Sequence, residues 1–148
     1  LNLLKHIRSQ GYTNTIILED DFDFLVTREQ FDTLISDFFK TVPNYAVTML
    51  SYNLNSGTDF NRVCGRALSV QTTAGYMIHK DFLDTLIDHY EVTQPQLERT
   101  GGREIRFICD QSWKVLQPHH TWLYFKQRIG KQRKSYSDIE KSVKNYGV

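Results

Sequence analysis

The sequence predicts an α/β fold in which helices pack on a sheet. A short strand pattern, Ile-Ile-Leu at 16–18, is followed at once by acidic residues. Apolar residues recur at helical spacing over 28–40 and 81–90, and segments rich in β-branched and aromatic residues alternate with these helices. The 148 residues suffice for a hydrophobic core, so we expect a single domain over 1–148.

The first two helices have recognisable ends. A helix is expected over 1–10, because its leucines and isoleucine fall on one face, and Gly11 is placed to end it. Thr27 and Gln30 have the spacing of a capping box, in which each side chain satisfies a free backbone amide. This motif predicts that the helix over 28–40 begins directly after Thr27.

The middle of the chain predicts two strands separated by one long loop. Val, Thr, Met and Tyr make 46–52 a strand, whereas 53–65 is rich in Asn, Gly, Ser and Asp and is expected to be a loop. A further strand is expected over 68–79, with Gly75 in its interior. A glycine inside a strand often marks a close approach of backbone or ligand. The helix over 81–90 follows.

The last third combines short elements with polar connections. A polar connection is expected over 91–106, and Asp110 follows a short apolar run, so it is expected to cap a helix over 111–117. A short strand is predicted over 122–125. The spacing at 137–140 is that of a second capping box, which predicts a terminal helix.

Composition excludes several classes of protein. The hydrophobic share is 40% and the charged share 24%, which is typical of a globular chain, and no apolar run approaches the ~18 residues of a membrane span. Cys64 and Cys109 are too few for a disulfide framework and lack metal-ligand spacing. The chain begins at Leu1 with no signal-peptide pattern, which favours a cytoplasmic protein.

The charges are unevenly distributed, although the net charge is only +1. Residues 19–37 hold seven acids and one base, whereas 126–134 hold five bases and no acid. A basic run is usually a solvated tail or a nucleic-acid contact. A third alternative is that the acidic and basic segments together hold a diphosphate from two sides.

Four carboxylates lie within five residues directly after the strand at 16–18: Glu19, Asp20, Asp21 and Asp23. Like charges this close repel unless a cation lies among them. Hard oxygen ligands suit Mg²⁺ or Mn²⁺, and in open α/β sheets ligands bind beyond the carboxyl ends of strands. The segment therefore predicts a metal site, and the alternative is a solvated acidic turn.

Three segments, in this order, resemble glycosyltransferase family 25. They are Ile-Leu-Glu-Asp-Asp at 17–21, Gln-Thr-Thr-Ala-Gly-Tyr at 71–76, and Asp-Gln-Ser-Trp-Lys at 110–114, which continues to Gln117. The segment 129–140 resembles the C-terminal end of that family, especially its members in large DNA viruses and protists. The family includes lipopolysaccharide-type transferases and relatives of the collagen galactosyltransferases.

The resemblance implies a GT-A-like fold and a metal-dependent transfer of a sugar from a nucleotide-diphosphate donor, with inversion. It implies Mn²⁺ or Mg²⁺, a UDP-sugar as donor, a glycan or glycoprotein hydroxyl as acceptor, and no nucleic acid as partner. A GT-A domain begins with a βαβ half that holds the nucleoside, so 1–148 is expected to be the larger, C-terminal part of one, with 126–148 as a basic closing segment. The viral members extend the predicted compartment to the cytoplasm of an infected host cell.

Each carboxylate of the acidic segment receives a predicted role. Glu19 and Asp21 are expected to bind the metal, because alternate residues of a strand share one face. Asp23 competes with them as a ligand, and Asp20, on the other face, is expected to contact the sugar or ribose. Solvation is the alternative for each of them.

The remaining candidates come from the second half of the chain. Asp110 is expected to act as the general base that takes the acceptor's proton, and its alternative role is helix capping alone. Lys131 and Arg133 are expected to close over the diphosphate, with a solvated tail as the alternative. His119 or His120 is a candidate third metal ligand, although a surface position is the simpler interpretation of either.

Two other classes of function stay open. One is a non-catalytic module that binds carbohydrate or polyanions on the same fold. The other is a phosphotransferase of the haloacid-dehalogenase type, since Asp21 and Asp23 follow a hydrophobic strand. That class needs an Asp directly after the strand and a later acidic pair, and this sequence has Glu19 and Asp20 there instead.

Overall fold

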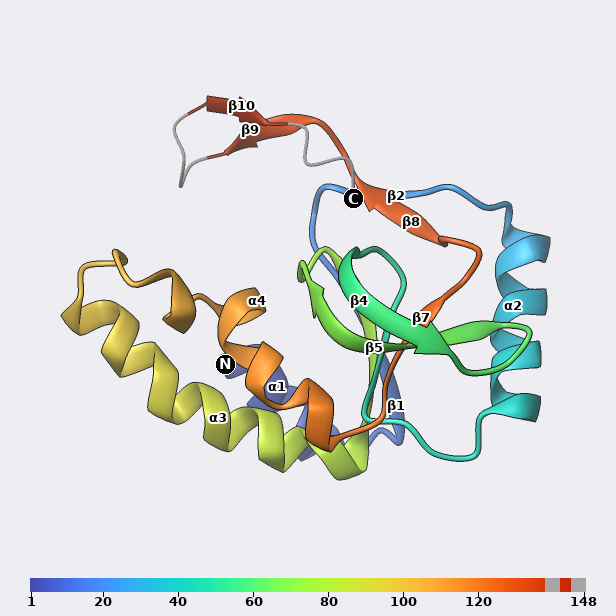
Figure 1. Cartoon of the computed structure of the whole chain (residues 1–148), viewed down its shortest axis with the longest axis horizontal. Coiled ribbons are helices and arrows are strands. Elements are labelled where there is room, and N and C mark those ends of the chain that lie inside the picture. The colour runs from blue at the N-terminus through green and yellow to red at the C-terminus, as the bar shows by residue number, and fades with distance from the viewer. Residues whose placement is uncertain (138–141, 145–148) are drawn as a thin grey trace.

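A computed structural model describes residues 1–137 and 142–144 and shows a mixed α/β fold built on one six-stranded sheet (Figure 1). The helices are α1 (Asn2–Gln10), α2 (Arg28–Thr41), α3 (Lys80–Arg99) and α4 (Cys109–Ser112), with short 3₁₀ turns η1 (Ile105–Phe107), η2 (Trp113–Val115) and η3 (Gln117–His119). The strands are β1 (Asn14–Leu18), β2 (Phe22–Phe24), β3 (Val47–Met49), β4 (Asn53–Asp59), β5 (Cys64–Gln71), β6 (Gly75–His79), β7 (Trp122–Phe125), β8 (Gly130–Gln132), β9 (Ser135–Ser137) and β10 (Ser142–Lys144).

The order of strands in the main sheet is β1-β6-β3-β7-β5-β4. Strands β1 and β3 both pair antiparallel with β6, and β3 pairs parallel with β7, so β1, β3 and β7 run in the same direction. Their carboxyl ends therefore meet at one edge of the sheet. Leu18 at the end of β1 lies opposite Gly75 at the start of β6, and Met49 lies opposite Tyr76.

Helices cover both faces of this sheet, because side chains alternate between the faces along each strand. Helices α1 and α3 cover one face and α2 covers the other (Figure 1). The buried residues of the first face include Leu4, Ile7, Val47, Met49, Tyr76, Ile78, Leu86, Trp113 and Trp122. Those of the second face include Phe38, Leu50, Met77, Leu123, Phe125 and Ile129.

A small ribbon of β2 and β8 lies over the sheet edge at which β1, β3 and β7 end. Its anchor is Phe22, whose ring occupies the space beside two glycines. A Cβ atom on Gly75 would lie 2.3 Å from the ring, and one on Gly130 would lie 2.0 Å from it. A close approach does occur at Gly75, but the group that approaches is the side-chain ring of Phe22, whereas backbone or ligand was expected.

Several local predictions are confirmed. The capping box forms as expected, since Gln30 N donates to Thr27 Oγ1 at 3.3 Å and Thr27 N donates to Gln30 Oε1 at 2.9 Å. Gly11 follows α1 with a left-handed φ of 71°. The strand predicted over 122–125 is β7.

Three other local predictions are wrong. The polar segment 53–65, predicted to be a loop, contributes β4 and the start of β5, which pair as a hairpin. The strand predicted over 68–79 is interrupted at 72–74, where the chain turns from β5 into β6. The predicted connection 91–106 is largely helical, since α3 continues to Arg99 with Pro95 inside it.

The terminal helix predicted after residue 137 can be compared with the structure only at residues 142–144. The capping box at 137–140 lies outside the described residues beyond Ser137. The described strand β10 pairs antiparallel with β9, so residues 142–144 do not belong to the terminal helix that was predicted. Among the described helices, none has the length and apolar character needed to cross a bilayer.

Gln117 holds the end of β5 in place with a buried side chain. Val70 N donates to Gln117 Oε1, and Gln117 Nε2 donates to Val70 O, both at 2.8 Å. The amide thus pairs with Val70 as a neighbouring strand would. Both residues are fully buried, so water cannot replace these bonds.

We expect Gln117→Leu to lower the free energy of unfolding by ~2–5 kcal/mol, because it leaves two buried backbone groups without partners. Urea denaturation followed by circular dichroism measures the change. Gln96→Leu, on the exposed surface of α3, is the matched control and should stay within ~0.5 kcal/mol of wild type. A Gln117→Leu protein as stable as this control would contradict the assigned role.

Candidate functional site

Three segments that are far apart in the sequence meet at the sheet edge after β1. They are the acidic turn at 19–21, the turn at 72–74 between β5 and β6, and the segment 110–117. Glu19 N donates to Ala74 O at 2.9 Å, and the Thr73 hydroxyl donates to a Glu19 carboxylate oxygen. These three segments carry the resemblance to family 25, and two of them contain predicted site residues, Glu19–Asp21 and Asp110.

Asp110 lies in the first turn of α4 and does not cap it. The N-cap is Ile108, so the prediction that Asp110 is the N-cap is wrong. Its Oδ2 accepts a hydrogen bond from Thr72 N at 3.2 Å, and Gln111 Nε2 lies 3.4 Å from the same oxygen. The carboxylate is therefore directed toward the turn at 72–74 and not toward its own helix.

A row of side chains from 110–117 contacts the last residues of β5 one after another. Asp110 binds the backbone amide of residue 72, Lys114 Nζ donates to Gln71 Oε1 at 2.6 Å, and Gln117 binds residue 70. The spacing of four and three residues places these side chains on one face of a helical turn. The row fixes the position of the strand end and of the turn that follows it.

Thr72 adopts a backbone conformation that β-branched residues rarely take. Its φ is 88°, and among the described residues it is the only one other than glycine with a positive φ. Such a conformation costs of the order of 1–3 kcal/mol and persists only where surrounding contacts enforce it. The bond from Thr72 N to Asp110 is one such contact. Strain of this kind often occurs at functional sites.

Glu19 lies in an environment that disfavours its charged form. Burial raises the pKa of the Glu19 carboxyl above its usual value of 4.5, the Thr73 hydrogen bond lowers it, and the negative charges of Asp21, Asp110 and Asp20 raise it further. The net direction is upward. The carboxylates of the acidic turn and of α4 therefore act on one another electrostatically.

The acidic segment is a turn and does not continue the strand. Phe22 N donates to Glu19 O at 3.1 Å, so the chain reverses over 19–22 and the predicted strand alternation of Glu19 and Asp21 is wrong. Asp21 accepts a hydrogen bond from Gln132 Nε2 at 3.0 Å. The turn brings β2 beside β8, and Gln132 of β8 thereby fixes the orientation of the Asp21 carboxylate.

The basic segment lies against the acidic turn. Arg133 N donates to Asp21 O at 2.8 Å, and Arg133 Nη2 lies 3.4 Å from Asp20 O. Lys131 lies opposite Asp23 in the ribbon of β2 and β8. The structure thus brings Arg133 beside the acidic turn, whereas Lys131 shares the face of Asp23. Residues 130–132 are a paired strand and not a solvated tail.

Asp23 is not brought together with Glu19 and Asp21. It alternates along β2 with Phe22, whose ring faces the sheet edge, so its side chain points to the other face of the ribbon. Across 1–137 and 142–144, no three His, Cys, Asp or Glu side chains are grouped in a way that suits a metal ion. Asp23, the competing ligand of the prediction, therefore lies apart from the predicted pair Glu19 and Asp21.

A two-carboxylate site is chemically reasonable at the same place. Mg²⁺ is commonly held by one or two carboxylates together with phosphate oxygens and water. Glu19 and Asp21 supply hard oxygen atoms. Burial is the main cause of the raised pKa of Glu19, and the smaller contribution from Asp21, Asp110 and Asp20 is repulsion that a cation would relieve. The donor set fits a metal shared with a phosphate ligand.

His119 and His120, the candidate third metal ligands, lie at the opposite edge of the sheet. His120 precedes β7, and its ring packs on Phe82 with centroids 4.8 Å apart. The strand register runs from Trp122 in β7 through Val47 and Ile78 to Thr15 in β1. Thr15 lies four residues before Glu19. At about 3.3 Å per residue, this is a separation of roughly 13 Å along the strands. Neither His119 nor His120 can share a metal with Glu19.

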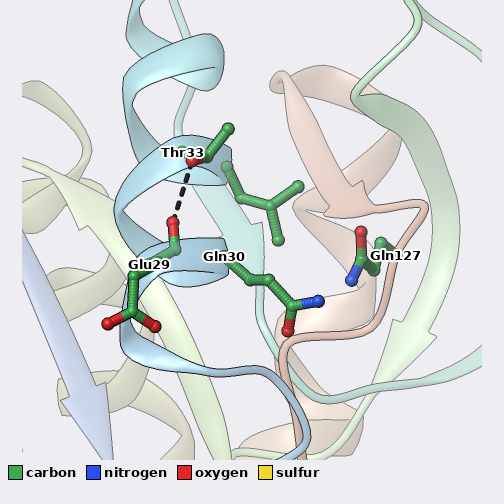
Figure 2. Close-up of a pocket in the computed structure, with 5 residues that line it drawn as sticks. Glu29, Gln30, Thr33 and Gln127 are labelled. Carbon is green, nitrogen blue, oxygen red and sulfur yellow. Dashed lines mark hydrogen bonds between the residues drawn. The ribbon is translucent and has the colours of Figure 1, made fainter.

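A groove of about 260 Å³ lies elsewhere, between the start of α2 and the segment after β7 (Figure 2). Glu29, Gln30, Thr33, Leu34 and Gln127 line it. Its polar groups are largely used within the helix, since Gln30 belongs to the capping box and Thr33 Oγ1 donates to Glu29 O at 2.8 Å. No residue of the acidic turn lines this groove, so it is not part of the site.

Sequence reasoning missed three polar residues of the site: Thr73, Gln71 and Lys114. All three belong to the segments that resemble family 25, but their side chains have no local signature that assigns a role. The spacing of Asp110, Lys114 and Gln117 on one helical face was the available signal. No protein-family model matches this chain, and no curated protein matches it either.

We expect Thr72→Gly to raise the free energy of unfolding by ~1 kcal/mol, because glycine adopts a positive φ without the steric penalty of a β-branched residue. Thermal unfolding measures the effect. Thr73→Gly is the matched control, since it loses the hydrogen bond to Glu19 and should be less stable than wild type. A Thr72→Gly protein that is less stable than wild type would show that the conformation is not strained.

We expect Glu19→Gln to stabilise the fold at neutral pH and not in acid. A carboxyl with a raised pKa in the folded state makes ionisation costly there, so wild-type stability falls as the pH rises through 4.5 toward the folded-state value. Below about pH 4 both proteins carry a neutral side chain and the difference should vanish. Melting temperatures of the two proteins between pH 3 and 8 measure it, and a difference that grows toward low pH would contradict the assignment.

Proposed function

We propose that this chain is the part of a glycosyltransferase that carries the metal-binding and catalytic carboxylates, with a GT-A-like fold. The observation that supports the proposal is the meeting of three separate segments, 17–21, 71–76 and 110–117, at one sheet edge. Each of them carries part of the family 25 resemblance, and an active site requires such convergence. The mixed α/β sheet with helices on both faces is compatible with the fold that is proposed.

Asp110 is the proposed general base. One of its carboxylate oxygens accepts the Thr72 N–H, which fixes the orientation of the group. In the described residues its second oxygen, Oδ1, accepts no side-chain or backbone hydrogen bond that would prevent it from taking a proton from an acceptor hydroxyl. A fixed carboxylate within reach of the hydroxyl is what general-base catalysis needs.

The leaving diphosphate requires positive charge as its bond to the sugar breaks. A divalent cation bound by Glu19, Asp21 and the phosphate oxygens would supply Lewis-acid stabilisation there. Arg133 lies beside the same turn and carries a charge of the right sign. Lys131 lies opposite Asp23, on the other face of the ribbon. Because Arg133 directly follows a paired strand, its proposed contribution is fixed electrostatic stabilisation.

A second candidate function is a module that binds carbohydrate without transferring it. It is favoured by the fact that the site carboxylates are already hydrogen-bonded within the protein. Thr73 donates to Glu19, the backbone N–H of residue 72 donates to Asp110, and Gln132 donates to Asp21. The dehalogenase-type phosphotransferase has no such support, because Glu19 directly follows β1 and the predicted nucleophile lies two residues later in a turn.

We expect Asp110→Asn to reduce sugar transfer by ~10²–10⁴-fold, the usual contribution of a general base. The asparagine oxygen can still accept the Thr72 N–H, so the melting temperature should change little. Release of UDP from a panel of UDP-sugars with Mn²⁺ and mixed glycan acceptors measures turnover. Asp88→Asn, exposed on α3, is the matched control.

The same preparations distinguish the two candidate functions. A transferase hydrolyses the donor or transfers its sugar, whereas a binding module retains carbohydrate affinity with no turnover in any variant.

Asp21→Asn should weaken Mn²⁺ binding measured by calorimetry in the presence of UDP. Equal turnover in Asp110→Asn and Asp88→Asn would remove Asp110 from the mechanism.

A further inference from the structure

Lys114 lies between the end of β5 and the helical turn that carries Asp110. Its part-buried ammonium group donates to Gln71 Oε1 at 2.6 Å and to Gln111 Oε1 at 2.7 Å. Gln111 extends this chain of contacts, since its Nε2 lies 3.4 Å from Asp110 Oδ2. Among the ion pairs of the described residues, none includes Lys114. The ammonium group and the carboxylate are therefore joined through one side-chain amide.

The lysine determines which way the Gln111 amide faces. An ammonium group can only donate hydrogen bonds, and an ionised carboxylate can only accept them. The amide satisfies both neighbours in one orientation, with its oxygen toward Lys114 and its NH₂ group toward Asp110. The reverse orientation would bring donors together at Lys114 and acceptors together at Asp110. Because hydrogen bonds to ionised groups are stronger than those between neutral groups, the charge on Lys114 enforces the first orientation.

The Gln111 amide and a backbone amide share one oxygen of the carboxylate. Thr72 N donates to Asp110 Oδ2 at 3.2 Å, and Gln111 Nε2 lies beside the same oxygen. Thr72 directly follows Gln71, which binds the other side of the ammonium group. Within the described residues Oδ1 accepts no hydrogen bond, so it is the oxygen that stays available to an acceptor hydroxyl.

We propose that Lys114 is a positioning residue that acts through Gln111. It keeps the Gln111 NH₂ group on Asp110 Oδ2 and thereby leaves Oδ1 to take the proton of the acceptor. The proposal rests on the proposed function for the role of Asp110, but the orientation of Gln111 does not depend on it. Lys114 touches no reacting atom in this role, and its effect falls on the geometry of the base. Geometry of this kind affects turnover more than substrate binding.

Steady-state kinetics of lysine variants test this role. Lys114→Met keeps the apolar stem and removes the donors, so kcat should fall by about 10–100-fold while the KM for the nucleotide sugar changes less than about twofold. Lys114→Arg keeps the charge and enough donors for both glutamine oxygens, and it should retain more activity than Lys114→Met. Lys40→Met, exposed near the end of α2, is the matched control and should behave as wild type. A purely structural tie would lower the melting temperature without lowering kcat per folded molecule.

A double-mutant cycle tests whether Lys114 acts through Gln111. Gln111→Leu removes the amide between the lysine and the carboxylate. In that background Lys114→Met should lower kcat much less than it does in wild type, because residues that act through one contact are not additive. Losses that multiply as independent effects would overturn the route through Gln111.

Nuclear magnetic resonance of the wild-type protein tests the orientation without turnover and without a variant. The Gln111 NH₂ group and the Thr72 N–H lie on one carboxylate oxygen, so a nuclear Overhauser effect is expected between them. Lys114→Met should abolish it and Lys40→Met should keep it. Its absence in wild type would overturn the proposal, whether or not the protein transfers sugar.

The proposed function and the role of Lys114 fail in different ways. A wild-type protein that shows the contact but transfers no sugar would contradict the proposed function alone. An active protein in which Asp110→Asn abolishes transfer and Lys114→Met matches wild type in kcat would overturn the role of Lys114 alone.

Discussion

The position of one strand end determines much of this structure. Side chains of 110–117 bind the last residues of β5 in sequence, with Asp110, Lys114 and Gln117 each taking one residue of 70–72. Because β5 is fixed there, the chain turns at 72–74 in a strained conformation and enters β6 directly beside the end of β1. The hydrogen bonds that stabilise the fold are thus the same ones that assemble the carboxylates.

The second constraint is the packing of one aromatic ring on two glycines. Phe22 lies where side chains of Gly75 and Gly130 would otherwise be, and this contact holds the ribbon of β2 and β8 against the main sheet. The ribbon in turn places Arg133 beside the acidic turn, more than a hundred residues away in the sequence. Apolar packing therefore brings Arg133 to the backbone oxygens of Asp20 and Asp21, within the acidic turn.

Elements whose signals are local were predictable from the sequence. The capping box at Thr27 works through residues three positions apart, and the helix that it begins has a strong apolar periodicity. The strand 122–125 is likewise marked by its own residues. The prediction failed at 53–65, where polar composition suggested a loop, because the hairpin depends on pairing with β5 and on contacts across the sheet. Pairing of that kind is a tertiary property that overrides local preference.

The sequence by itself determined the α/β fold class and the acidic segment, because helical periodicity and carboxylates directly after a strand are local patterns. Only the tertiary structure decided how those residues are placed. It separated Asp23 from Glu19, placed His120 at the far edge of the sheet, and turned Asp110 from a helix cap into the partner of a strained backbone amide. Directions of side chains depend on turns and on contacts between distant segments, and no spacing within one segment encodes them.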